Sequence, residues 1–161
     1  MKLAHKIGLA GLTLITLNQS AQAVDVGVLF SGLVTETCAV NVGTTGTLAL
    51  SPDGTTLSSE NAGGIQGTAI VTTNGLGSTI EVVAPTSFLT GPPTADTNTV
   101  FDANYDLSGA TVITDILNTV TTPLNLGTTT ISMDATATKS DGTFSAGAYS
   151  LVTTVRCTSS V

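Results

Sequence analysis

The chain has 161 residues, of which 41% are hydrophobic, 9% are charged and 4% are aromatic. It contains 32 threonines and 17 glycines, a composition typical of an all-β domain rather than of a helical bundle or a charged disordered chain. After residue 23 the only cations are Lys139 and Arg156, against eleven carboxylates, and no histidine remains. So few cations argue against binding to nucleic acid or to anionic membranes. The lack of histidine excludes Ser-His-Asp and Cys-His catalysis and histidine-ligated metals, so we expect no enzyme activity.

Residues 1–23 have the pattern of a secretory signal peptide. Lys2 and Lys6 form a positive amino-terminal region, residues 7–17 form an apolar stretch of 11 residues, and Ala21-Gln22-Ala23 is a small-x-small cleavage site. The apolar stretch is too short to span a bilayer, which needs about 20 residues. We therefore expect an exported chain that begins at Val24, passes through the periplasm to the cell surface or the medium, and has no stable membrane insertion.

Beyond residue 23, short runs of Val, Ile, Leu and Thr alternate with turn-forming residues. In the first run, residues 24–31, the side chains of Val24, Val26, Val28 and Phe30 fall on one face of an extended strand. Further strands are predicted, in chain order, at residues 33–40, 47–50, 67–73, 78–83, 99–107, 128–137 and 147–157. No stripe of helical period and length appears in this part of the chain. We expect one all-β domain, an immunoglobulin-like β-sandwich over residues 24–161 with about seven to nine strands.

The connections between these strands carry their own predictions. Asn74-Gly75 is a hairpin signal, so residues 78–83 are expected to pair back on residues 67–73. Residues 111–117 fit either a strand or a single helical turn. Loops are expected at residues 55–64 and 85–98, and turns at residues 43–46, 51–54 and 140–143.

Cys38 and Cys157 are the only cysteines and lie 119 positions apart, near the two ends of the exported chain. Disulfides persist in the compartments that exported proteins reach, and an even number of cysteines favours pairing. A redox-active pair would have a CxxC spacing, which is absent. We therefore predict a structural Cys38–Cys157 disulfide, which brings the first and last strands close together.

Both ends of the exported chain resemble those of a known family. The segment Phe30-Ser31-Gly32-Leu33-Val34-Thr35-Glu36-Thr37-Cys38-Ala39-Val40 resembles the start of chaperone–usher fimbrial subunits, which have an aromatic residue, a glycine, an extended Val-rich stretch and then Cys-x-Val. The segment from Ala146 to Val155, with Gly147 and Tyr149, is similar to the closing strand of fimbrial and spore coat protein U-like subunits. The resemblance covers about 11 residues at the front and about 12 at the back of the exported chain.

This resemblance implies a fold and a function. Subunits of that family have an immunoglobulin-like sandwich without its last strand, and the N-terminal strand of the next subunit fills the open groove. Val24, Val26, Val28 and Phe30 would then be the donor side chains of a fibre subunit that supports adhesion. Its partners would be other copies or related subunits, with a periplasmic chaperone and an outer-membrane usher during export.

A second interpretation stays open from the sequence. The first strand also has the pattern needed to close its own sandwich, and the predicted bridge between Cys38 and Cys157 suits a self-contained domain. The protein would then be an exported binding or adhesion module that does not polymerise.

A few acidic and aromatic residues could form a calcium site or a sugar-binding site, or they could simply be surface and core residues. Asp96, Asn98, Asp102 and Asp106 supply oxygen atoms for a calcium site, but the spacing of an EF-hand loop is missing, so an acidic solvated surface is favoured and no metal or cofactor is predicted. Glycoside hydrolysis usually needs aromatic platforms, and the chain has no tryptophan. Two tyrosines are present, and both are expected to pack in the core or at its rim: Tyr105 and Tyr149.

Overall fold

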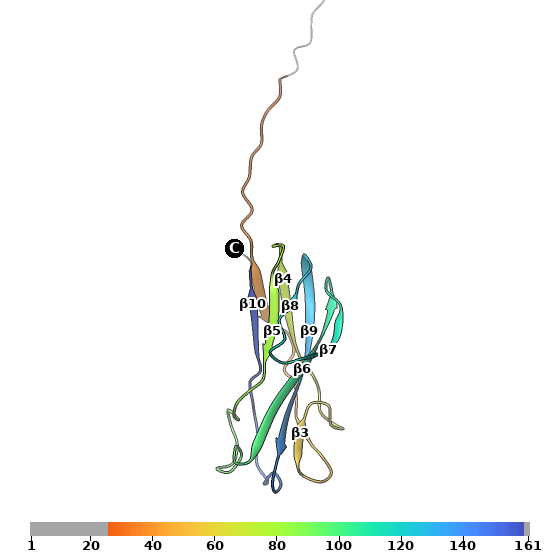
Figure 1. Cartoon of the computed structure of the whole chain (residues 1–161), viewed down its shortest axis with the longest axis vertical. Coiled ribbons are helices and arrows are strands. Elements are labelled where there is room, and N and C mark those ends of the chain that lie inside the picture. The colour runs from red at the N-terminus through yellow and green to blue at the C-terminus, as the bar shows by residue number, and fades with distance from the viewer. Residues whose placement is uncertain (1–25, 160–161) are drawn as a thin grey trace, which may run out of the picture. The chain divides into compact units, whose positions relative to one another are not determined.

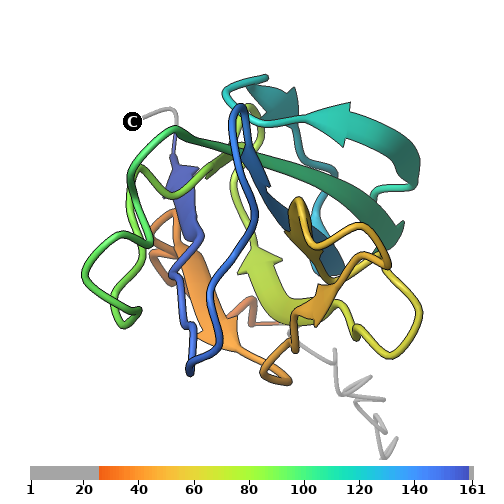
Figure 2. The ribbon, with the colours of Figure 1, turned by 90° about the horizontal axis from the view of Figure 1, so that it is seen from below.

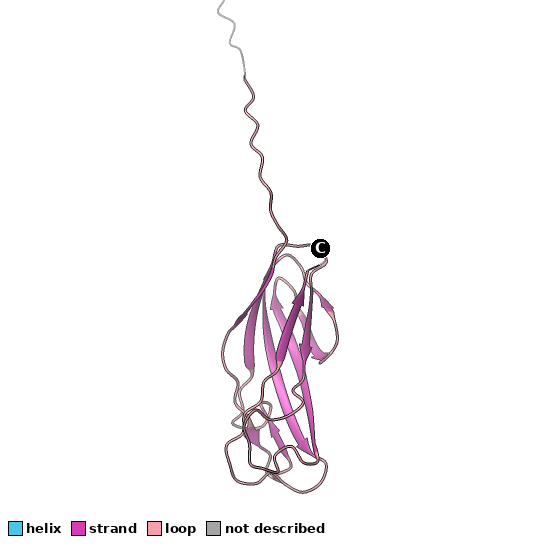
Figure 3. Ribbon diagram, turned by 90° about the vertical axis from the view of Figure 1, so that its left-hand side faces the viewer, coloured by secondary structure: helices cyan, strands magenta, loops and turns pink. Residues whose placement is uncertain are grey.

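The structure is a computed structural model that describes residues 26–159, and these residues form only strands and loops (Figures 1 and 3). The predicted signal peptide and Val24 lie outside the described residues. The described part of the chain contains ten strands: β1 (Cys38–Val42), β2 (Ala49–Leu50), β3 (Thr56–Ser58), β4 (Gly67–Thr73), β5 (Thr79–Val83), β6 (Thr99–Gly109), β7 (Ile113–Leu117), β8 (Thr122–Pro123), β9 (Gly127–Lys139) and β10 (Thr154–Thr158). The prediction of an all-β domain is confirmed.

The larger of the two antiparallel sheets is organised around β9. On one edge β9 pairs with β6 over the whole length of β6, and β6 also pairs with β7. On its other edge β9 pairs first with β4 and then with β3. The sheet continues outward through β1, which pairs with β4, and β2, which pairs with β3.

The smaller sheet contains three strands in the order β10-β5-β8. The prediction that residues 78–83 pair back on residues 67–73 is therefore wrong, because β5 belongs to the opposite sheet from β4. The side chains of Ile80 and Val82 on β5 are fully buried, so they face the core across from β4 instead of extending its sheet. The turn that links the two sheets is fixed by a 2.8 Å hydrogen bond between the buried hydroxyls of Thr73 and Ser78.

The core between the sheets follows from period-two patterns on the longest strands. On β9, Ile131, Ala135 and Ala137 point inward, and the intervening Thr and Ser residues point outward. The buried side chains form two clusters. The first gathers around Val71, Ile80, Val82, Tyr105, Leu107 and Ile131, and the second around Leu57, Phe88, Ala95, Ala137 and Phe144.

Several further segments differ from their predictions. Of the strand predicted at residues 33–40, residues 33–37 belong to no strand, and the short strand β8 was not predicted. Residues 55–64, expected to be a loop, contain the short strand β3. Residues 147–157, expected to be one strand, are a strand only from Thr154, and before it a single bridge joins Thr90 to Ser150. Residues 26–31, the described part of the first predicted strand, belong to no strand. Residues 111–117 contain the strand β7, which decides between the two alternatives left open.

The hydroxyl of Tyr105 anchors the loop between β7 and β8 to the core. Tyr105 is only 1% exposed, and its Oη lies 2.9 Å from the Val120 carbonyl oxygen and 2.9 Å from Thr122 Oγ1. Burial raises the pKa of the Tyr105 phenol above its ordinary value of 10.0, and the negative charge of Glu81 adds to that rise, while the hydrogen bond from Thr122 opposes it. The neutral phenol is therefore the form that the fold stabilises.

We predict that Tyr105→Phe lowers the free energy of unfolding by about 0.5–1.5 kcal/mol at neutral pH, because the hydrogen bonds of the hydroxyl are lost. Because the folded-state pKa is raised, the contribution of the phenol is present below pH 10 and is lost as the pH rises beyond it. Denaturant titrations at several pH values check this. The difference in stability between the wild-type protein and the variant should shrink above that pH, and a constant difference would contradict the assignment.

Candidate functional site

Two sheet edges meet at β1 and β10. Among the strands that the structure describes, β1 pairs only with β4, and β10 pairs only with β5. The two strands lie beside each other, with β1 in orange next to β10 in Figure 1. The predicted disulfide between Cys38 and Cys157 joins them, with a Cα–Cα distance of 6.0 Å. That prediction is confirmed, and such a bond is typical of an oxidising, exported environment.

Beyond the disulfide, the chain that follows β1 is hydrogen-bonded on the side that faces β4. Gly43 N donates to the Thr68 carbonyl at 2.9 Å, and Thr47 N donates to the Ile65 carbonyl at 2.8 Å. Gly46 lies so close to this backbone that a Cβ there would come within 2.8 Å of Gly67 N, so only glycine fits without a shift. The edge of residues 43–47 toward β4 is thus occupied by these bonds, and the opposite edge is free to face the chain that precedes β10.

The chain that precedes β10 is likewise hydrogen-bonded on one side only, to residues 89–90. Ser150 N donates to the Thr90 carbonyl at 2.9 Å, and Leu89 N donates to the Ser150 carbonyl at 2.8 Å. Figure 2 shows this segment in blue beside the orange N-terminal strand. Residues 43–47 and the segment before β10 therefore face each other, and their backbone hydrogen bonds point away from the space between them. No strand lies in that space among the described residues.

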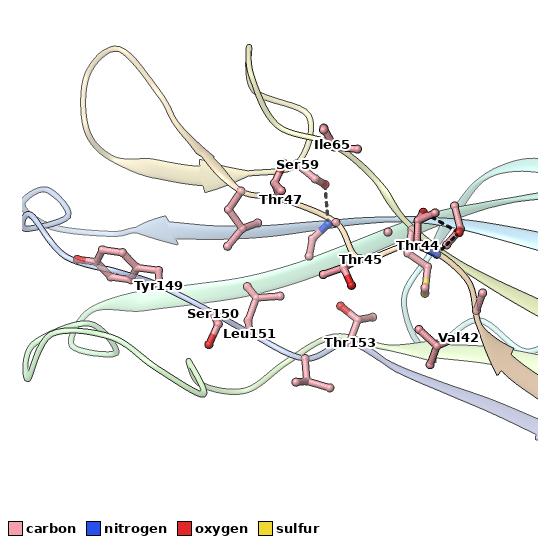
Figure 4. Close-up of a pocket in the computed structure, with 18 of the residues that line it drawn as sticks. Val42, Thr44, Thr45, Thr47, Ser59, Ile65, Tyr149, Ser150, Leu151 and Thr153 are labelled. Atoms are coloured by element: carbon pink, nitrogen blue, oxygen red, sulfur yellow. Dashed lines mark hydrogen bonds between the residues drawn. The ribbon is translucent and has the colours of Figure 1, made fainter.

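This space is a groove with a volume of about 990 Å³ (Figure 4). Its lining contains no Asp, Glu, Lys, Arg or His residue and is mostly apolar. β1 and the residues that follow it form one side of the groove, with Val40, Val42, Leu48 and Leu50. The larger sheet forms the base, with Leu57, Ala69, Met133 and Ala135. β10 and the residues that precede it form the other side, with Tyr149, Leu151, Thr153 and Val155. An uncharged groove of this kind favours an apolar occupant, since charge buried there would lack a partner.

Burial alternates along one side of the groove. Every residue from Tyr149 to Val155 lines that side, with the half-buried Leu151, Thr153 and Val155 separated by the exposed Val152 and Thr154, and Val40 and Val42 line the other side. Several apolar side chains of the lining are open to solvent, for example Val42 at 87% and Leu50 at 50% exposure. Successive side chains of an extended segment point to opposite faces, so a strand laid here would direct alternate side chains at the base of the groove.

An aromatic cluster borders the groove at the end away from the disulfide, where Figure 4 shows Tyr149 far from Val42. The ring of Tyr149 packs edge-on against Phe88 and Phe144, at centroid distances of 5.1 and 5.4 Å. Its hydroxyl donates to the Ser145 carbonyl at 2.7 Å. Tyr149 is half-buried and Tyr105 is buried, so both tyrosines pack in or beside the core as predicted.

The groove runs along both core clusters. Met133 and Val155 pack on the first cluster, and Leu48 and Leu151 pack on the second. The apolar interior is therefore incomplete along this line, and an apolar strand in the groove would contact both clusters. The sequence predicts a strand at residues 149–155 from their alternation, but it does not predict the groove. The absence of a paired strand on one side does not change the residue types of the segment beside it.

Residues 26–33 form a separate segment with its own character. They belong to no strand, and their large apolar side chains are exposed, with Val26 at 80%, Val28 at 70% and Phe30 at 90%. Leu29 and Leu33 are each 90% exposed as well. A continuous run of exposed apolar residues in an acidic chain usually marks an interaction site.

The carboxylates considered for a calcium site serve local structure instead. Asp96 Oδ1 accepts from Phe88 N at 2.8 Å, Asp106 Oδ1 accepts from Asp115 N at 2.8 Å, and Asp102 accepts from the Asn118 side chain. Over residues 26–159, no three or more His, Cys, Asp or Glu side chains are grouped so that they could hold a metal ion. No helix within these residues is long and apolar enough to cross a membrane.

Comparison of the chain with protein-family models, with curated proteins and with solved structures gives no match.

We predict that replacing both Cys38 and Cys157 by Ser lowers the free energy of unfolding by roughly 2–5 kcal/mol, because the bond closes a long loop of the unfolded chain. Chemical denaturation of the wild-type protein and the double variant measures this change. Peptide mass mapping of the exported protein without reductant should find one linked peptide pair that contains both cysteines. Two free thiols in that protein would contradict the assignment.

Proposed function

We propose that the protein is a structural subunit of a bacterial surface fibre that supports adhesion and assembles by donor-strand exchange. In this proposal residues 1–23 direct export, and residues 24–31, here called the donor segment, occupy the groove of another copy. The donor segment would complete an immunoglobulin-like sandwich that lacks one strand. The observation that carries the proposal is the uncharged apolar groove between β1 and β10, in a chain whose N-terminal segment exposes apolar side chains at strand spacing.

The backbone supports this kind of partner. An extended peptide that adds to a sheet edge gains affinity from main-chain hydrogen bonds and specificity from pockets for alternate side chains. Here the edges of β1 and β10 both border the groove, so one inserted strand would have hydrogen-bonding neighbours on two sides. Without such a strand these edges remain open to unspecific pairing, a hazard that proteins normally suppress.

The side chains support it as well. Val24, Val26, Val28 and Phe30 share one face of the donor segment, and none of their side chains carries a charge. At about 1.5–3 kcal/mol for each buried apolar side chain, four of them supply roughly 6–12 kcal/mol before the cost of association is subtracted. Because the cost of association is of similar size, the main-chain hydrogen bonds to the two edges would have to add to this gain.

The proposal also defines the protein's needs before assembly. An unfilled groove exposes apolar surface during export, so a periplasmic chaperone would cover it and an outer-membrane usher would exchange that chaperone for the next subunit. The alternative function, a self-contained exported binding module, needs no such partner. The two are separated by whether the exported protein forms multimers through the donor segment.

We predict that Val28→Asp or Phe30→Asp abolishes multimers of the exported protein while the subunit stays folded, because a charged side chain would enter the apolar groove. Leu29→Asp is the matched control, since Leu29 is equally exposed but lies on the opposite face of the donor segment. Analytical ultracentrifugation measures assembly and circular dichroism measures folding. Variants that remain both folded and fully assembled would refute strand exchange.

On the acceptor side, we predict that Val42→Asp also prevents assembly, and that it changes the free energy of unfolding by no more than about 0.5 kcal/mol because this valine is exposed. Val112→Asp is the control, because Val112 is 70% exposed but does not line the groove. Equal assembly of the two variants would exclude the groove as the acceptor. A wild-type protein that is monomeric at every concentration would favour the binding module.

A further inference from the structure

We propose that the Cys38–Cys157 disulfide is a stop that closes one end of the groove and fixes how far a donor strand enters. The inference rests on the proposed function and adds a specific requirement: only a segment whose free N-terminus lies directly before Val24 fits the closed end. The bond would then determine the register of assembly in addition to stabilising the fold.

The distance across the groove at this end carries the argument. Neighbouring strands in a sheet lie about 4.8 Å apart, so a strand inserted between two others holds them about 9.6 Å apart. The Cα atoms of Cys38 and Cys157 are 6.0 Å apart and covalently linked through their side chains. No third strand passes between them, whereas the groove is open between Val40 and Val155 and beyond.

A closed end imposes a direction on the donor strand. The C-terminal side of the donor segment continues into its own folded domain, so it has to leave the groove through an end that is not blocked. The N-terminal side ends at Val24 once the predicted signal peptide is removed, and such an end can stop against the disulfide. The donor would therefore run with Val24 near Val40 and Val155 and with Phe30 toward Tyr149.

The start of the folded domain is itself fixed beside the closed end. Asn74 Oδ1 accepts from Thr37 N at 2.6 Å, and Asn74 Nδ2 donates to the Thr35 carbonyl at 3.0 Å. This leaves only residues 32–34 between the donor segment and the fixed backbone, and three residues span at most about 11 Å. If the donor segment filled the groove of its own chain in this direction, Phe30 would lie near Tyr149. Residues 32–34 would then have to reach back along the whole groove to Thr35, which they are too short to do. The donor is therefore a second copy of the chain.

Binding of synthetic peptides tests the stop. The acceptor is the oxidised, exported full chain carrying Val28→Asp and Phe30→Asp, which disables its own donor segment. Three peptides are compared by calorimetry: residues 24–34, the same peptide with Gly-Ser-Gly-Ser added before residue 24, and the same peptide with Gly-Ser-Gly-Ser added after residue 34. The two extended peptides have identical composition and differ in which end is lengthened, and the N-terminal extension also moves the charged amino group four residues away from Val24.

We expect the N-terminal extension to weaken binding at least about tenfold, because the strand must withdraw and lose at least one buried apolar side chain. The C-terminal extension should change the affinity less than about twofold, which is below 0.5 kcal/mol. Equal affinities for both extended peptides, or a larger loss from the C-terminal extension, would overturn the stop while the proposed function stands. Failure of all three peptides to bind would overturn the proposed function itself.

A second acceptor protein tests whether the Cys38–Cys157 disulfide is what stops the donor strand. In the chain that also carries Cys38→Ser and Cys157→Ser, the penalty of the N-terminal extension should fall below about threefold. A penalty that persists in the folded double variant would show that packing, and not the disulfide, closes the groove. If that variant does not fold, the three peptides on the oxidised acceptor still decide the proposal.

Discussion

The covalent bond between β1 and β10 is the contact on which the rest of the structure depends. These two strands form the edges of different sheets, and no ladder of hydrogen bonds joins them among residues 26–159. The disulfide holds the edges together at one end, and the groove opens between the chains beyond it. The sandwich is thus fixed in shape while one strand position remains unfilled, and this combination is what an acceptor of a foreign strand requires.

Charge would confine the proposed association of copies to that position. The chain after residue 23 has eleven carboxylates and only two cations, so copies would repel one another over most of their surface. The side chains of the groove and of the apolar face of the donor segment are uncharged, so burying them against each other would remove apolar area from water without removing a charged side chain from it. The outward faces of β6 and β9 carry hydroxyls and carboxylates, which suits a surface that stays solvated. Attraction and repulsion therefore favour one mode of contact.

Much of this fold is encoded in local sequence patterns, and the groove is not. The boundaries of β4 and the extent of β9 follow from alternation of Ala, Val and Ile with Thr and Ser, and the pairing of Cys38 with Cys157 follows from export and number. The partner of β5 was predicted wrongly because Asn74-Gly75 marks a turn but not the sheet in which the next strand continues. The irregular backbone at residues 147–153 was missed because Tyr149, Leu151 and Thr153 keep strand alternation although the neighbour on one side is absent.

Mixing two complementary variants tests the central claim most directly. One full chain carries Val28→Asp and Phe30→Asp, so it keeps its groove but has no usable donor segment; the other carries Val42→Asp, so it keeps its donor segment but has a blocked groove. Strand exchange predicts that each variant alone is monomeric and that an equimolar mixture forms a dimer with one chain of each kind and no larger species, as measured by sedimentation or native mass spectrometry. A mixture that stays monomeric while the wild-type protein assembles, or variants that assemble alone, would contradict the account.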